Sequence, residues 1–117
     1  MQHKVDNLIS TIDWNGLQID GPNDSVITLG DLPAKWKAFG WEVLVLENGN
    51  DVEAVINTLQ LAQTKTGKGK PVMVLMKTVM GKGVDFMENN HNWHGVAPDD
   101  AQLAKALAQL EETVGDY

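Results

Sequence analysis

Residues 41–79 read WEVLVLENGNDVEAVINTLQLAQTKTGKGKPVMVLMKTV, and this stretch decides the class of fold. Its beginning, WEVLVLENG, is typical of a strand, and PVMVLMKTV near its end is a second apolar run of strand length. The segment between them predicts an amphipathic helix, and TGKGKP predicts a solvated turn. Two strands separated by such a helix indicate a βαβ unit, and therefore a parallel sheet.

The helix in this unit, DVEAVINTLQLAQTK, is expected to begin behind an N-cap at Asp51. Its polar residues Glu53, Asn57, Gln60 and Gln63 are expected to face solvent. The apolar residues that recur at helical spacing, and are expected to face the sheet, are Val52, Val55, Ile56, Leu59 and Ala62.

Elements on either side of this unit are also predicted. Val5–Asp13 is a short apolar run that suits a strand. The segment DLPAKWKAFG predicts a short helix with Asp31 as N-cap, Pro33 in its first turn and Gly40 past its end. DDAQLAKALAQLEE, residues 99–112, predicts a final helix. The fold class expected is α/β, a parallel sheet with helices on both faces.

Composition narrows the classes of function. The 117 residues carry 16 acidic and 9 basic side chains, a formal net charge of −7, which argues against nucleic acid and anionic membranes as partners. The absence of cysteine excludes disulfides and thiolate metal sites, and no apolar run is long enough to span a membrane. The default expectation is a cytoplasmic protein.

The stretch Asp13–Gly21, DWNGLQIDG, follows a predicted strand, where parallel sheets usually bind ligands. Asn-Gly between extended runs is a strong hairpin signal, but a two-residue turn cannot join parallel strands, which favours a ligand-facing loop. The side-chain oxygen of Asn15 and the carbonyl oxygen of Leu17 could point the same way and suit Mg²⁺ that is also held by phosphate. A plain glycine-containing loop is the alternative.

A second loop, between Gly81 and Pro98, is too long and too polar for an idle connection. His91 and His94 lie three residues apart, but on no predicted helix and without a clear third ligand, which disfavours zinc. One imidazole that donates to a phosphate or a substrate hydroxyl is the simpler interpretation. The segment GKGK at residues 67–70 precedes a strand and lacks a following Ser or Thr, so it is not a P-loop.

Three segments together carry a family resemblance: DNLISTIDWNGLQIDG, KWKAFGWEVLVLENGND and GKPVMVLMKTVMGKGVDFMENNHNWHGVAPDD. In this order, over nearly the whole chain, they resemble the thiamine-diphosphate-binding domain of transketolases, particularly the separate N-terminal part of split bacterial enzymes. The resemblance implies that residues 1–117 are the C-terminal part of a PP-type binding domain, a partial thiamine-diphosphate-binding fold.

The resemblance also implies roles for individual residues. Asn15 matches the family's metal-binding Asn, and Leu17 matches the residue whose backbone carbonyl binds the metal. Ile19 matches an apolar residue that packs against the cofactor, and His94 matches a His that contacts the diphosphate and the reacting centre. The metal expected is Mg²⁺, with Ca²⁺ as an alternative. The residues expected to contact thiamine diphosphate are Gly16, Ile19, Met80 and His94.

The sequence departs from the family at several points. Met80 replaces the Lys found in some members and removes a charge that could face phosphate, and Trp14 replaces a frequent Asn. The family's Gly-Asp-Gly segment, whose Asp is the charged metal ligand, lies further upstream of the Asn than Met1 does here. We therefore expect this chain to hold half a metal site.

The activity that the resemblance implies for a complete enzyme is the transfer of a two-carbon ketol unit between sugar phosphates. The expected partners are sugar phosphates, further copies in a homo-oligomer and a pyrimidine-binding C-terminal transketolase subunit. The chain alone is expected to be inactive. The alternative is a truncated, non-catalytic α/β association module that binds no cofactor, whose exposed sheet edges self-associate.

Overall fold

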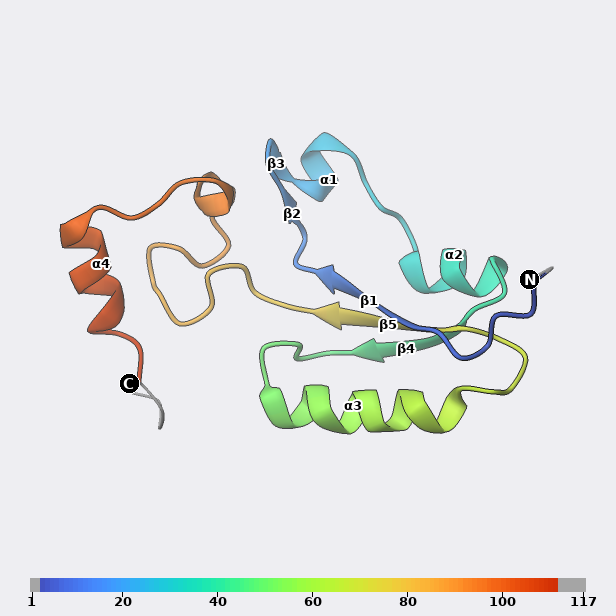
Figure 1. The fold of residues 1–117 in the computed structure, drawn as a ribbon. Coiled ribbons are helices and arrows are strands. Elements are labelled where there is room, and N and C mark those ends of the chain that lie inside the picture. Colours follow the sequence, from blue (N-terminus) through green and yellow to red (C-terminus); the bar gives the residue numbers. More distant parts are fainter. Residues whose placement is uncertain (1–2, 112–117) are drawn as a thin grey trace.

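The computed structural model of the chain describes residues 3–111, and its centre is a three-stranded parallel sheet (Figure 1). The strand order is β1-β5-β4, with Ile9 and Glu42 both aligned with Val72. The elements are β1 (Ile9–Trp14), β2 (Leu17–Gln18), β3 (Gly21–Pro22), α1 (Asn23–Val26), α2 (Leu32–Ala38), β4 (Glu42–Leu46), α3 (Val52–Lys65), β5 (Val72–Lys77), the 3₁₀ helix η1 (His91–His94) and α4 (Asp100–Leu107).

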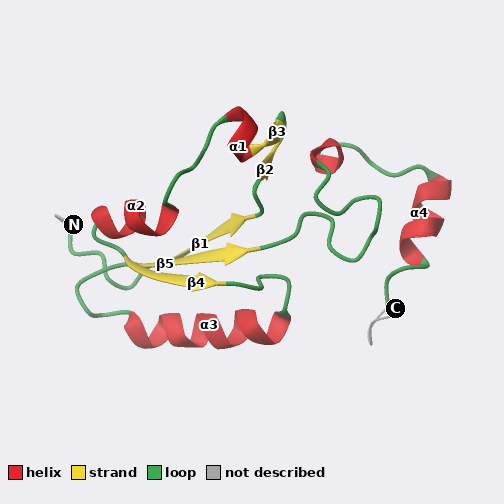
Figure 2. Cartoon of the chain, turned by 180° about the vertical axis from the view of Figure 1, so that it is seen from behind, coloured by secondary structure: helices red, strands yellow, loops and turns green. Residues whose placement is uncertain are grey.

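The central strand β5 is covered on both faces. Val72, Met73, Val74 and Leu75 are each at most 1% exposed, although successive side chains of a strand point to opposite faces. Ala62 of α3 packs with Val72 and Val74 on one face. Helices α2 and α3 lie on opposite sides of the sheet (Figures 1 and 2), which confirms the expected α/β class.

Two helices begin where the sequence predicts. The Asp31 side chain accepts from the Ala34 N–H at 2.9 Å, and the Asp51 side chain accepts from the Ala54 N–H at 3.0 Å. Each bond satisfies a backbone donor that the helix itself leaves free, so both predicted N-caps are confirmed. The final helix, predicted over residues 99–112, ends earlier, at Leu107, and residue 112 lies outside the described residues.

The buried side of α3 differs in part from the prediction. Ala62 is fully buried and Val55 and Leu59 are half-buried, as expected. Val52, however, is 73% exposed and Ile56 is 49% exposed. The sheet beneath α3 has only three strands, so it covers a narrower stripe of the helix than the apolar spacing predicts.

The first strand begins four residues later than predicted, at Ile9. Lys4 has a φ of 50°, and the chain that follows lies against the turn of residues 66–70. The Asp6 carbonyl accepts from the Gly67 N–H, and the Asp6 side chain accepts from the Gly69 N–H, both at 2.9 Å. This confirms that residues 67–70 form a turn, and it shows why residues 5–8 do not extend β1.

A small hairpin follows β1. β2 and β3 pair antiparallel through Leu17↔Pro22 and Gln18↔Gly21, so Ile19 and Asp20 form the two-residue connection. A hairpin thus forms in this stretch, but its turn is Ile19–Asp20 and not the Asn15–Gly16 pair, and the ligand-facing role of the stretch stays a prediction. The rule against two-residue turns applies to the parallel pair β1 and β5, and this ribbon lies beyond the end of β1.

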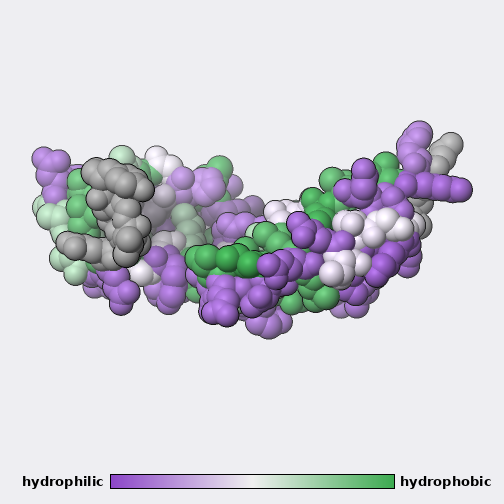
Figure 3. All heavy atoms as spheres, turned by 60° about the horizontal axis from the view of Figure 1, so that its bottom comes forward, coloured by the Kyte–Doolittle hydropathy of each residue, from purple (hydrophilic) through white to green (hydrophobic). Residues whose placement is uncertain are grey.

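The chain is more extended than its length predicts. Its radius of gyration is 17.4 Å, whereas a compact chain of this length would have about 13 Å. Residues 78–107 project away from the sheet (Figure 1), and apolar side chains are open to solvent on the face shown in Figure 3. Over the whole described part of the chain, the most exposed large apolar side chains are Val52, Phe39, Ile19, Ile27, Val96 and Leu107.

Gly49 provides a test of how tightly the end of the sheet is packed. A Cβ on Gly49 would lie 2.8 Å from Thr78 Cγ2 and 3.0 Å from the Lys77 carbonyl oxygen. We therefore expect Gly49→Ala to lower the free energy of unfolding by about 1–3 kcal/mol in urea denaturation. Gly95→Ala is the control, because nothing lies within 4 Å of its added methyl group. Equal stability of the two variants would contradict this packing.

Candidate functional site

The carboxyl ends of the three parallel strands meet at one edge of the sheet, and hydrogen bonds tie together the loops that leave them. The Gly49 N–H donates to the Lys77 carbonyl at 2.6 Å, and the Val79 N–H donates to Asn50 Oδ1 at 2.7 Å. The Thr78 hydroxyl also bonds the carboxylate of Asp13, which joins the ends of β5 and β1. This edge is therefore held by contacts between all three strands.

The bend after β1 is built around Asn15. Asn15 Oδ1 accepts from the Leu17 N–H at 2.9 Å, and the Gly16 carbonyl accepts from the Asn23 N–H at 2.9 Å. The second bond continues the β2–β3 ribbon by one pair. Bonded and non-bonded pairs alternate in an antiparallel ribbon, so Leu17 and Pro22 form a non-bonded pair.

This pairing determines where the Leu17 carbonyl points. In a non-bonded pair, both backbone groups of Leu17 point away from β3, and its N–H already meets Asn15 Oδ1. The N–H and C=O of one strand residue point to the same side, so the Leu17 oxygen lies on the side of Asn15. Two neutral oxygens on one side of a ribbon fit a hard cation such as Mg²⁺.

Met80 and Gly81 begin the long loop after β5, which folds on itself. The Asn89 N–H donates to the Met80 carbonyl at 3.0 Å, and Met80 is half-buried. Gly81 has a φ of 70°, and a Cβ there would lie 2.5 Å from the Met87 carbonyl oxygen. This close approach requires glycine at position 81.

His94 is the last residue of η1, so the expectation that His91 and His94 lie on no helix was wrong. Asn90 caps this short helix by accepting from the Asn92 N–H at 3.2 Å. The indole N–H of Trp93 donates to the Phe86 carbonyl at 3.0 Å and anchors η1 to its own loop. Residues three apart in a 3₁₀ helix are eclipsed, so both histidines lie on one face.

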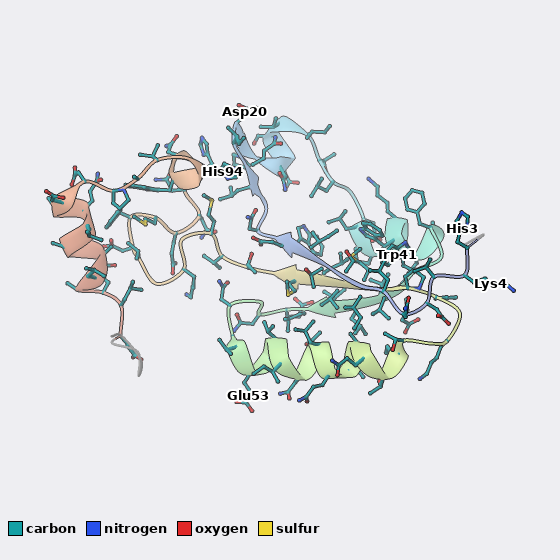
Figure 4. The ribbon with its side chains drawn as sticks, in the orientation of Figure 1. His3, Lys4, Asp20, Trp41, Glu53 and His94 are labelled. Atoms are coloured by element: carbon teal, nitrogen blue, oxygen red, sulfur yellow. The ribbon has the colours of Figure 1, made fainter. Side chains whose placement is uncertain are left out.

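The hairpin and η1 lie together although they are far apart in the sequence. η1 contacts β2, and Figure 4 shows His94 beside the ribbon that carries Asp20. The structure thus brings His94 close to the segment of Asn15, Gly16 and Leu17. Ile19, at the tip of the ribbon, is 69% exposed, and Met80 lies in the loop that leads to η1.

A surface cleft of about 200 Å³ lies beside the Asn15 bend. Trp14, Gly16 and parts of residues 23–30 line it, so Gly16 is the one predicted site residue at its wall. Within residues 3–111, no three His, Asp or Glu side chains come close enough together to hold a metal ion.

Sequence reasoning missed three residues at this edge. Asp13 and Asn50 hold the strand ends together, and both are polar residues just at or after a strand, which could have marked them. Gln18 places its Nε2 atom in a buried position with no hydrogen-bond partner in the described part of the chain. Gln18 belongs to β2, which η1 contacts, and the sequence carries no signal for this non-local contact.

Two carboxylates stabilise the loop that carries His94. Hydrogen bonds from Gln109 and Lys105 lower the pKa of Asp85, and the Gly83 N–H and Lys82 lower the pKa of Glu88. The Asp85 bonds connect the loop to α4 and the segment after it. The charged forms of both groups therefore favour the folded loop.

Comparison with known proteins identifies the class of this site. Residues 1–113 match the model of the transketolase thiamine diphosphate binding domain. One subunit of the apulose-4-phosphate transketolase of Phocaeicola vulgatus is 38% identical over 97% of this chain and 39% of its own length. The 6-deoxy-6-sulfo-D-fructose transketolase subunit SqwG of a Clostridium species is 34% identical over 93% of this chain and 38% of its own length.

Solved structures agree with this class. The transketolase of Campylobacter jejuni superposes with a TM-score of 0.80 at 30% identity, over 92% of this chain and 16% of that one. The Pichia stipitis transketolase in complex with sedoheptulose 7-phosphate superposes with a TM-score of 0.75 at 27% identity, over 86% of this chain and 14% of that one. The chain therefore belongs to the transketolase family, within its thiamine-diphosphate-binding domain.

It spans less than two fifths of the relatives' length. None of the helices in residues 3–111 is long and apolar enough to cross a bilayer.

The lowered pKa values of Asp85 and Glu88 predict an acid-sensitive loop. A carboxylate with a lowered folded-state pKa stabilises the fold above its unfolded pKa, and this contribution is lost as pH falls through the folded value. Below about pH 4 we expect smaller protection factors against amide exchange at residues 83–88 and 103–109, so that exchange there approaches the rate of an unfolded chain at the same pH. Asp85→Asn should show faster exchange already at neutral pH.

Glu53→Gln is the control for this measurement, because Glu53 points into solvent from α3 (Figure 4). It makes the same carboxyl-to-amide change outside the loop. Identical exchange in both variants would show that the Asp85 carboxylate does not hold α4 against the loop.

Proposed function

We propose that this chain is part of a transketolase that transfers a two-carbon ketol unit between sugar phosphates with thiamine diphosphate and Mg²⁺. The observation that carries the proposal is the position of two oxygens, Asn15 Oδ1 and the Leu17 carbonyl, on one side of a ribbon that contacts the helix ending in His94. Family membership supports the cofactor and the class of reaction.

In this proposal, Asn15 and Leu17 bind the metal through neutral oxygens. Mg²⁺ takes about six oxygens and usually receives several from phosphate and water. Two protein oxygens from this chain leave the remaining positions to the diphosphate, to water and to a carboxylate from outside residues 1–117. Ca²⁺ also accepts such oxygen ligands and is the alternative ion.

The cofactor is proposed to contact Gly16, Ile19, Met80 and His94. Gly16 has open space around it, which lets a phosphate approach the backbone. Ile19 is an apolar side chain that is 69% exposed at a ribbon tip, as expected for a residue that packs against a ligand ring. Met80 offers an apolar contact where some family members carry a Lys.

His94 is proposed as the catalytic residue of this chain. Thiamine diphosphate supplies stabilisation of a carbanion when it is bound, so the protein is left to orient the reactants and transfer protons. An imidazole ring can donate a proton or accept one. His94 is exposed, and η1 holds it near the proposed metal ligands.

A partner protein is the second part of the proposal. The two relatives above are subunits of transketolases, and this chain spans 39% and 38% of their lengths. The open apolar side chains and the extended shape support a chain that is covered by further protein. We propose that a homo-oligomer and a pyrimidine-binding transketolase subunit complete the site, that the lone chain is inactive, and that the assembly is cytoplasmic.

The domain assignment follows from this proposal. Residues 1–117 would form the C-terminal part of the PP-type binding domain, and the Gly-Asp-Gly part would come from elsewhere. The alternative, a non-catalytic association module, predicts an assembly that never binds the cofactor.

Calorimetric titration with thiamine diphosphate and Mg²⁺, with the pyrimidine-binding subunit present, tests the metal ligands. We expect Asn15→Ala to weaken binding by at least about tenfold, or about 1.4 kcal/mol, because an oxygen ligand is lost. Asn57→Ala is the control, because Asn57 is exposed on α3. Unchanged binding by Asn15→Ala would refute its role, and no binding by any assembly would favour the non-catalytic module.

Steady-state kinetics of the assembled enzyme test His94. If it transfers a proton, His94→Ala should lower kcat by about 10² to 10⁴ while cofactor binding persists. His3→Ala is the matched control, since His3 lies at the opposite end of the molecule from His94 (Figure 4). A similar kcat for the two variants would exclude His94 from catalysis.

A further inference from the structure

The chain contains two Asn-Gly pairs, Asn15–Gly16 and Asn48–Gly49. In such a pair, the backbone nitrogen of the glycine can attack the Asn side-chain carbonyl, since glycine has no Cβ to hinder the approach. In an unfolded chain the two pairs should react alike, because their local chemistry is the same. In the folded structure the two pairs have different surroundings.

Asn15–Gly16 is arranged for this reaction. Asn15 Oδ1 accepts from the Leu17 N–H at 2.9 Å, so the side chain folds back over its own backbone and its carbonyl carbon is polarised. Gly16 is exposed, and apart from its chain neighbours no described residue lies within 4 Å of the position of an added Cβ. In residues 3–111, no hydrogen bond from the Gly16 N–H is found.

Asn48–Gly49 has the opposite surroundings. The Gly49 N–H donates to the Lys77 carbonyl at 2.6 Å, so the nitrogen that would attack is held in place. Thr78, Met76 and the Lys77 carbonyl lie within 3.0 Å of the position of an added Cβ. The peptide cannot rotate toward the Asn48 side chain without breaking the contacts at the end of the sheet.

We infer that Asn15–Gly16 is a site of spontaneous deamidation in the folded protein and that Asn48–Gly49 is protected. The Gly16 nitrogen forms a bond to Asn15 Cγ, and the amide nitrogen leaves as ammonia to give a cyclic imide. Water then opens the imide at either carbonyl, which yields aspartate or isoaspartate at position 15. The reaction needs water alone and involves no oxidation or reduction.

This inference rests on geometry and is independent of the proposed function. If the proposed function holds, the reaction has a direct consequence for the metal site. Aspartate would replace a neutral oxygen ligand by a charged one, and isoaspartate would add a methylene to the backbone ahead of Leu17. The affinity of this edge for cations would then change with the time that has passed since the protein folded.

Peptide mapping of the aged protein tests the inference with an internal control. Cleavage after lysine places Asn15 in the peptide of residues 5–35 and Asn48 in that of residues 38–65. The full chain is incubated at mildly alkaline pH, once in its folded state and once unfolded in about 8 M urea. Tandem mass spectrometry then locates each amide-to-carboxyl mass change. Asp20–Gly21 isomerises without a mass change and cannot be confused with Asn15.

We expect Asn15 to deamidate at least about tenfold faster than Asn48 in the folded chain, and at a similar rate in urea. Gly49→Ala provides a second readout. This substitution disturbs the packing around residue 49 and leaves Asn15–Gly16 unchanged, so Asn15 should deamidate no more slowly in the variant. Equal rates at the two sites without urea, or faster reaction at Asn48, would overturn the inference.

Discussion

The burial of β5 between β1 and β4 is the constraint on which the rest of the structure depends. Val72–Leu75 are nearly inaccessible to solvent, so this strand must pair on both edges and be covered on both faces. Parallel pairing on both sides brings three strand ends to one edge, and the loops that follow them therefore meet there. The candidate site exists because of this arrangement.

Segments of the chain at the same edge expose apolar side chains to solvent. The ribbon β2–β3 and the segment of residues 78–99 extend beyond the sheet (Figure 1). Ile19 in the ribbon and Val96 in that segment are both largely exposed. Many large apolar side chains of the described residues are exposed in this way. Their exposure to water is unfavourable in an isolated chain and is typical of surfaces that other protein covers. The relatives, which are more than twice as long, are consistent with such a cover.

The sequence predicted the elements whose signals are local. The caps at Asp31 and Asp51 determine where α2 and α3 begin, and the apolar run of residues 71–79 contains the strand β5. The prediction failed where distant contacts decide. Residues 5–8 leave the expected strand because Asp6 binds the turn near Gly67 and Gly69.

The same distinction holds at the site. Asn15, Leu17 and His94 could be singled out by motif and resemblance, and the structure brings their segments together. The β2–β3 hairpin, the contact of η1 with β2 and the buried amide of Gln18 all depend on the path of the chain in space. No spacing pattern encodes those contacts. The roles of the individual residues remain predictions.

The central claim is that the carboxyl edge of the sheet binds the metal and the diphosphate. Its most direct test is the NMR spectrum of the isotope-labelled chain, assembled with thiamine diphosphate and its pyrimidine-binding partner protein, while Mn²⁺ replaces Mg²⁺. The account predicts that paramagnetic broadening first removes the signals of Asn15, Leu17 and His94, while residues 65–70 at the opposite end stay sharp. Broadening centred on residues 65–70, or no selective broadening, would contradict it.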